Sequence, residues 1–229
     1  MNDLSSQFPI LDELTFLNHA AVAPISEPAA EALRWYAERA SRHAYVKSMW
    51  YDKLDQFRQQ AATLINARGS HELAFVPNTS AGLNLVSGGL DFMPGDQVVI
   101  SDVEYPSNRY PWQMLERLGV EVVEVRQRED FRVDEDDVIN AITDKTRVVA
   151  LSHVQFSTGF RTDLKRISDV VHQVRGYLCV DAIQSVGVLP VDVQAMGIDF
   201  LSADGHKWML GPEGAGIFYC HEELIELLR

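Results

Sequence analysis

The chain has 229 residues, of which 46% are hydrophobic and 23% are charged, a composition typical of a folded globular protein. Its 33 acidic and 20 basic residues give a net charge of −13, which repels phosphate backbones and anionic lipid surfaces and argues against nucleic acid and membranes as partners. The N-terminal residues lack the basic start and apolar stretch of a signal peptide, and no apolar run approaches the ~18 residues of a membrane span, so we expect a cytoplasmic protein.

Two amphipathic helices are expected early in the chain, over Glu27–His43 and Tyr51–Ala67. Pro28 lies in the first turn of the earlier helix, where proline is tolerated because the first N–H groups of a helix have no partner within it. We expect residues 1–70 to form an N-terminal arm that carries these helices.

From about residue 70 onward, apolar runs alternate with amphipathic stretches, an arrangement that produces parallel strands joined by crossover helices. Seven strands are expected, over residues 72–76, 97–101, 120–125, 147–154, 177–181, 199–203 and 216–220. Helical patterns cover residues 80–86, 107–118, 135–142 and 164–174, and the last residues, EELIELLR, are expected to begin another helix. The pattern predicts an α/β domain over residues 71–229 with a seven-stranded, mostly parallel sheet and helices on both faces.

The two cysteines, Cys179 and Cys220, each lie within an apolar strand-like run. Packed thiols are therefore favoured over a disulfide or a metal pair. We assign them no chemistry and expect no metal site.

Lys207 lies in the segment SADGHKWMLGPEGAG, between the end of an apolar strand and a loop rich in glycine. Open α/β sheets bind their ligands at the carboxyl ends of their strands. A solvated surface lysine is the plain alternative, because charged side chains are seldom buried unpaired. However, Asp204, His206 and Trp208 lie close by in sequence, and a lysine in such a pocket can act as an amine nucleophile toward a carbonyl.

Polar residues follow two other strands. In PNTSAGLNLV, Asn78, Thr79 and Ser80 open a helix whose first N–H groups could bind an anion, although N-capping alone would also explain them. Asp181 ends a very apolar strand, with Gln184 three residues on, and the alternative is an aspartate that caps the next helix. No GxxxxGK[ST] or GxGxxG pattern indicates a nucleotide.

An anion cradle, a carboxylate and an amine at three strand ends match what pyridoxal 5′-phosphate requires. This cofactor has a phosphate, a ring nitrogen that a carboxylate keeps protonated, and an aldehyde that condenses with lysine. The protonated ring then acts as an electron sink. We therefore predict pyridoxal 5′-phosphate as the cofactor.

In these motifs the chain resembles the large domain of the class V aminotransferases, a pyridoxal-phosphate family that includes cysteine desulfurases, kynureninase, serine–pyruvate transaminases and isopenicillin N epimerase. The resemblance covers nearly the whole chain and implies an aspartate aminotransferase-like large domain. It rests on Gly205-His206-Lys207, on Asp181 with Gln184, on Asn78-Thr79-Ser80 and on FLNHAAVAP from Phe16.

The resemblance implies catalytic roles for Lys207 and Asp181. Lys207 would form the internal aldimine and carry protons at the substrate carbon, and Asp181 would hold the pyridinium nitrogen. Gln184 would reach the ring hydroxyl.

It also implies a phosphate site formed by His206 and Thr79, with Asn78 and Ser80 in the same helix start. Tyr105 falls where the family places an aromatic residue or a histidine stacked on the pyridine ring. A half-buried tyrosine that fills a niche in a loop is an equally good interpretation of Tyr105.

Two departures from the family pattern bear on the reaction. Desulfurases carry histidine at the position of Tyr105 and a motif like SNxxG where this chain reads VQFSTG, which weakens a desulfurase interpretation and favours an epimerase or a transaminase. Desulfurases also use a serine against the phosphate where this chain has Asp204. Because an acidic group would repel a phosphate, we expect Asp204 to turn toward a backbone group or His206.

The leading hypothesis is a pyridoxal-phosphate enzyme, transaminase-like or epimerase-like, that acts on an amino acid through a lysine aldimine. The resemblance also implies a homodimer, with Trp35, Tyr36, Trp50 and Tyr51 as candidate interface residues, although core packing explains these aromatic residues about as well.

Three alternatives stay open. The first is a catalytically incomplete, cofactor-binding large-domain fragment: family members resemble longer two-domain chains, and we expect the C-terminal small domain, with its carboxylate-binding arginine, to be absent. The second is an enzyme like cysteine desulfurase or selenocysteine lyase. The third is an α/β protein that binds another phosphate compound, which would leave Lys207 without a purpose.

Overall fold

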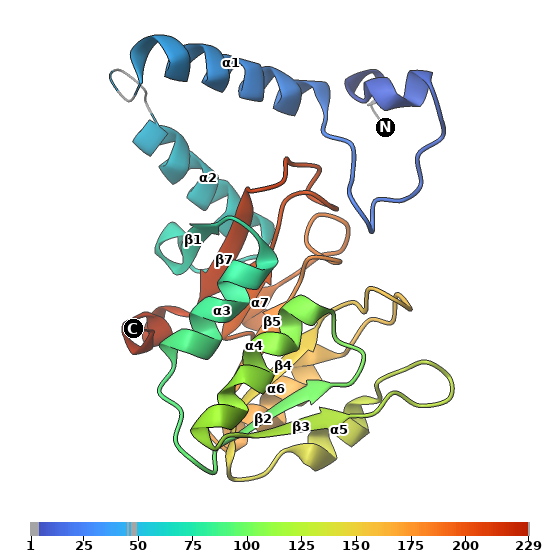
Figure 1. Ribbon diagram of the computed structural model, residues 1–229, viewed down its shortest axis with the longest axis vertical. Coiled ribbons are helices and arrows are strands. Elements are labelled where there is room, and N and C mark those ends of the chain that lie inside the picture. Colours follow the sequence, from blue (N-terminus) through green and yellow to red (C-terminus); the bar gives the residue numbers. More distant parts are fainter. Residues whose placement is uncertain (1–4, 45, 47–49, 229) are drawn as a thin grey trace.

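The structure is a computed structural model that describes residues 5–44, 46 and 50–228. Seven strands form one sheet in the order β1-β7-β6-β5-β4-β2-β3 (Figure 1). They are β1 (Leu73–Val76), β2 (Gln97–Ser101), β3 (Glu121–Val125), β4 (Thr146–Ser152), β5 (Tyr177–Asp181), β6 (Phe200–Ala203) and β7 (Gly216–Cys220). Among the described strands, β7 runs opposite to the other six, which confirms the predicted mostly parallel sheet.

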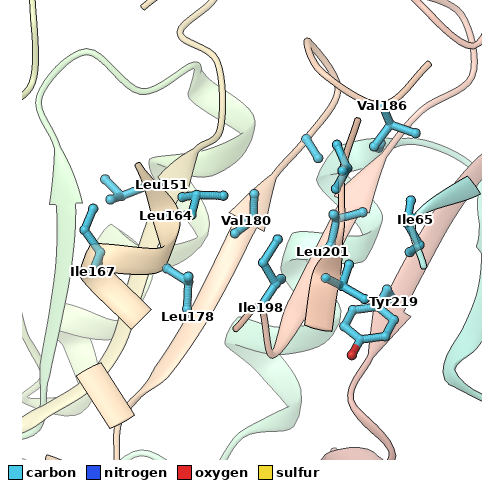
Figure 2. Packing of buried hydrophobic residues seen from close by; sticks show 14 of the residues in the cluster. Ile65, Leu151, Leu164, Ile167, Leu178, Val180, Val186, Ile198, Leu201 and Tyr219 are labelled. Carbon is cyan, nitrogen blue, oxygen red and sulfur yellow. The ribbon is translucent and has the colours of Figure 1, made fainter. Parts of the chain in front are cut away.

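Helices cover both faces of the sheet, as predicted. One face packs against α2 (Trp50–Leu64), α5 (Glu135–Ala141), α6 (Leu164–Gln173) and α7 (Val193–Met196), and Figure 2 shows part of this core. The opposite face packs against α3 (Thr79–Gly89) and α4 (Tyr110–Gln113).

The strand β4 shows why these sequences fold this way. Val149 and Leu151 contact the first core, whereas Val148 and Ala150 contact the second, because successive side chains of a strand point to opposite faces. A strand covered on both faces needs apolar residues at every position, which explains the continuous apolar runs in the sequence.

The N-terminal segment contains two 3₁₀ helices, Ser5–Gln7 and Pro9–Asp12, and the predicted helix α1 (Glu27–His43). No residue of α1 is buried, and Figure 1 shows this helix extending across one end of the molecule, away from the sheet. The end of α2, in contrast, joins the core through Ala61 and Ala62. The domain boundary at residue 70 therefore stays a prediction. Within the described residues, no helix combines the length and the apolar character needed to span a bilayer.

Three helix predictions differ from the structure. Residues 107–118 form a broken succession of a 3₁₀ helix (Pro106–Asn108), α4 and a second 3₁₀ helix (Met114–Leu118), since prolines at 106 and 111 have no N–H to donate. Helix α2 ends at residue 64 rather than 67, because Asn66 adopts a left-handed φ of 53°. The expected C-terminal α-helix is a 3₁₀ helix, Glu222–Leu227; residue 229 lies outside the described residues.

The carboxyl ends of six strands lie at one edge of the sheet. Strand β1 is antiparallel to β7, which is antiparallel to β6, so β1 points the same way as the parallel strands β2 to β6. The loops that follow β1, β2, β4, β5 and β6 therefore meet, and this is the edge at which open α/β sheets bind ligands.

Candidate active site

A cavity of about 650 Å³ lies among these loops. All eight residues that the sequence singled out as binding or catalytic line it: Asn78, Thr79, Ser80, Tyr105, Asp181, Gln184, His206 and Lys207. The N-terminal segment adds Asn18 and residues 20–22 as another wall. The structure therefore brings the predicted site together, while the role of each residue stays a prediction.

The start of α3 forms one end of the cavity. Asn78 is its N-cap, because its side-chain Oδ1 accepts a hydrogen bond from the Ala81 N–H at 2.8 Å. Ser80 donates its hydroxyl to Ser107 at 2.7 Å. The first N–H groups of a helix have no partner inside it, so this capped end can still donate to an anion.

Asp204 lies against this end and is only 3% exposed. One of its carboxylate oxygens accepts the Gly205 N–H at 2.7 Å, and the other lies 2.7 Å from Nδ1 of His206. The expectation that Asp204 turns toward a backbone group and His206 agrees with this geometry.

Asp181 and Lys207 both line the cavity, and each affects the pKa of the other. Burial raises the pKa of Asp181 to about 7, the nearby Glu104 raises it further, and the Ile183 N–H and Lys207 oppose the shift. The pKa of Lys207 is lowered, chiefly by burial, against the opposing effect of Asp181 and Asp204. A lysine with a lowered pKa has more of the neutral amine that attacks a carbonyl.

Gln184 joins three segments of the chain. Its Nε2 donates to the Ala20 carbonyl oxygen at 2.9 Å, and its Oε1 accepts from the indole N–H of Trp208 at 2.9 Å. The Trp208 ring in turn stacks on His19 with ring centroids 5.4 Å apart. The FLNHAAVAP segment is thus part of the site, and an amide NH₂ has a second hydrogen available for a ligand.

Tyr105 lies in the loop that follows β2, with 47% of its surface exposed. Its ring centre is 5.8 Å from Nζ of Lys207, and its ring meets that of Phe156 edge-on at 5.1 Å. Sequence reasoning quoted VQFSTG but gave Phe156 no role, although this residue lines the cavity. Its position a few residues after a buried strand is the feature of the sequence that could have indicated a place in the site.

Sequence reasoning also missed Glu104, which is 5% exposed. Its carboxylate accepts hydrogen bonds from Ser101, Asn108 and Gln155 side chains and from both the N–H and the hydroxyl of Ser152. These bonds fasten the loop after β2 to the end of β4 and so hold Tyr105 at the cavity. A glutamate three residues after the end of an apolar strand is the feature of the sequence that could have indicated it.

These residues fit pyridoxal phosphate. Within the described chain, the buried Asp181 carboxylate has a single hydrogen-bond donor, the Ile183 N–H at 3.0 Å, so a cationic ring nitrogen would supply its missing partner. A helix start suits the phosphate, and an amine with a lowered pKa suits the aldehyde. The fold and the site define the class of pyridoxal-phosphate-dependent enzymes built on an aspartate aminotransferase-like large domain.

The chain belongs to the class-V aminotransferase family, since the family model described as Aminotransferase class-V matches residues 15–229. This confirms the resemblance seen in the motifs, together with the cofactor of the family. The chain is 36% identical over 227 residues to a probable cysteine desulfurase of Methanothermobacter thermautotrophicus, across 97% of this chain and 56% of that protein.

Solved structures of related proteins have the same fold as this chain. An apo cysteine desulfurase from Thermococcus onnurineus superposes with a TM-score of 0.90 at 28% identity, over 99% of this chain and 58% of that one. A variant of the C-DES protein, with glycine covalently linked to its pyridoxal-phosphate cofactor, superposes with a TM-score of 0.91 at 25% identity, over 100% of this chain and 62% of that one. The chain thus spans little more than half the length of these relatives.

Proposed function

We propose that this chain provides the cofactor site of a pyridoxal-phosphate-dependent enzyme that transfers a proton at the α-carbon of an amino acid, in the manner of a transaminase or an epimerase. The single observation that supports it most directly is one cavity that holds the buried Asp181, the Lys207 amine and the capped start of α3. When bound, the cofactor supplies an aldehyde for amines and a ring that withdraws electrons from the α-carbon.

Each side chain then has a task that its surroundings favour. The carboxylate of Asp181 keeps a proton on the ring nitrogen, and burial strengthens that interaction because little water screens it. Lys207 accepts and returns the proton of the α-carbon as a general base and acid, for which its lowered pKa suits it. Tyr105 covers one face of the ring, and Thr79 and His206 hold the phosphate.

Cleavage of a carbon–sulfur bond is the second candidate reaction. It is favoured by the printed names of the relatives, which are cysteine desulfurases. The Tyr105 and VQFSTG departures argue for the first candidate. Cys179 and Cys220 are both buried in strands, outside the residues that line the cavity. Neither is available there to accept sulfur.

Cofactor attachment is tested by mixing the purified chain with pyridoxal phosphate, reducing with borohydride and locating the added mass by peptide mass spectrometry. The label is expected on Lys207. The matched controls are Lys207→Ala, which should lose the label, and Lys165→Ala on the exposed face of α6, which should keep it. A label on another lysine in the wild-type chain, or none, would contradict the proposal.

The reaction is tested separately, because the chain spans 56–59% of its curated relatives. Exchange of the α-proton of amino acids in heavy water reports the first candidate, and sulfide released from cysteine with a thiol reductant reports the second. Exchange without sulfide is the expected result. Rapid sulfide release that is lost in Lys207→Ala would instead establish the second.

We further propose a cytoplasmic homodimer in which exposed aromatic side chains of the N-terminal helices, including Trp35, Tyr36 and Tyr51, contribute to the subunit interface. Analytical ultracentrifugation tests this assembly. A chain that sediments as a monomer at all concentrations, with cofactor bound, would exclude it.

A further inference from the structure

Asp204 is an acidic residue where the proposed function requires a phosphate. It lines the cavity beside the start of α3 and is 3% exposed, so little water screens its charge. A buried carboxylate beside a phosphate is repulsive unless a cation or a donor neutralises it. The way in which this charge is compensated therefore decides whether the pocket can hold an anion.

The side chain of Asp204 compensates its charge through His206. Its second oxygen lies 2.7 Å from Nδ1 of His206, so the ring carries a proton on that nitrogen. A neutral ring with this proton presents Nε2 as an acceptor, which cannot donate to a phosphate oxygen. A doubly protonated ring would donate from both nitrogens, one of them to the Asp204 carboxylate 2.7 Å away and the other to a phosphate oxygen.

The backbone of Asp204 acts on a second candidate donor. Its N–H donates to the hydroxyl oxygen of Thr79 at 3.0 Å, so the Thr79 hydroxyl is an acceptor on that side. The hydroxyl keeps its own hydrogen for another partner. Thr79 is itself held in place, because the Ser202 hydroxyl donates to its carbonyl oxygen at 3.0 Å.

We propose that Asp204 is a positioning residue that presets His206 and Thr79 as hydrogen-bond donors to the phosphate of the cofactor. This inference rests on the proposed cofactor site. The carboxylate and the imidazolium form a pair with no net charge, so the acidic residue favours phosphate binding through its neighbour rather than opposing it.

The test compares pyridoxal phosphate with pyridoxal, which has the same ring and aldehyde but no phosphate. Dissociation constants for both are measured by fluorescence titration for the wild-type chain and for Asp204→Asn and Asp204→Ala. Loss of one charge-assisted hydrogen bond corresponds to a weakening of about tenfold or more. We expect this weakening for pyridoxal phosphate in both variants, while the dissociation constant of pyridoxal changes less than about twofold.

A double-mutant cycle assigns the effect to His206. In a His206→Ala background, Asp204→Asn is expected to weaken pyridoxal phosphate binding much less than in the wild-type chain, because the two residues act as a unit. Should Asp204→Ala fail to fold, the isosteric Asp204→Asn carries the test alone, with circular dichroism as the check on its fold.

Three results would overturn the inference: equal weakening for both ligands, unchanged or tighter binding of pyridoxal phosphate in Asp204→Asn, or full additivity with His206→Ala. These results differ from failure of the proposed function, in which the wild-type chain itself acquires no cofactor on Lys207.

Discussion

Replacing Asp181 with asparagine is expected to stabilise the cofactor-free protein at neutral pH and to remove its hold on the cofactor. Asp181 ends β5, is 3% exposed and has a pKa raised from 3.8 to about 7 by burial. Below pH 3.8 this carboxyl is protonated in the folded and the unfolded chain alike. As the pH rises toward 7, the unfolded chain releases the proton while the folded chain keeps it, so the free energy of unfolding falls.

The size of the effect follows from the two pKa values. Each pH unit between 3.8 and about 7 costs roughly 1.4 kcal/mol, so the full loss is on the order of 4 kcal/mol. The calculated isoelectric point is near 4.9, where the protein has least charge to keep it dispersed, so the accessible range starts near pH 5.5. From there to pH 7 the loss is about 2 kcal/mol, or roughly 4–8 °C in melting temperature for a chain of this size.

The assay is thermal unfolding of the wild-type and Asp181→Asn proteins, both without cofactor, at several values between pH 5.5 and 8.5. The difference in melting temperature between the variant and the wild-type protein should grow by roughly 4–8 °C from pH 5.5 to pH 7 and level off above pH 7. Adding pyridoxal phosphate should then raise the melting temperature of the wild-type protein alone. Asp144→Asn, the same change at an exposed turn, is the control. A difference between Asp181→Asn and wild type that stays flat across this pH range would refute the reasoning.

Three further predictions concern packing. Gly82→Ala should lower the free energy of unfolding by about 1–3 kcal/mol, because its Cβ would lie 2.2 Å from a serine hydroxyl on β6. Gly88→Ala in the same helix meets open space and should raise the free energy of unfolding by about 0.5–1 kcal/mol. Urea denaturation that gives both variants the same stability would contradict this. Gly187→Ala should lower the free energy of unfolding by more than about 2 kcal/mol in the same assay, since its φ is +100° and its Cβ would lie 2.4 Å from a backbone oxygen in the loop after β6. A smaller loss would show that this loop moves to accommodate the methyl group. Burial raises the pKa of Cys220 to about 12 and that of Cys179 well above its usual value. Neither thiol should therefore react with a disulfide reagent until the protein is unfolded, and labelling of either thiol in the native protein would disprove this prediction.

The strands could be predicted well because burial on both faces leaves a simple mark in the sequence. The bounds of β2, β5 and β7 agree with the predicted ranges, and β4 ends two residues earlier because His153 and the residue after it already belong to the loop. The order of the strands could not be predicted. Apolar runs carry no record of which strand pairs with which, and nothing in GIFYC indicates that β7 lies antiparallel between β1 and β6.

The same reasoning explains which parts of the candidate site were found. Residues at or shortly after the end of a strand, such as Asn78, Asp181 and Lys207, could be placed at one edge because parallel strands bring their carboxyl ends together. The bond between Gln184 and Ala20 joins positions far apart in the chain, and no local pattern predicts such a contact. Glu104 was missed for a related reason, since three of its five hydrogen bonds, those from Ser152 and Gln155, form only when β2 and β4 are adjacent.

The place of β7 has a consequence for the growing polypeptide. Strand β1 hydrogen-bonds within the sheet only to β7, with Val76 opposite Gly216 and Leu73 opposite Tyr219. During translation, β1 therefore leaves the ribosome with neither of its edges paired and stays unpaired until β7 has been made, about 140 residues later. Pairings between such distant segments form slowly, and an unpaired strand can associate with other chains in the meantime. A nascent chain stalled before residue 216 therefore exposes an unpaired β1 and is expected to aggregate more readily than a chain in which β7 has been made.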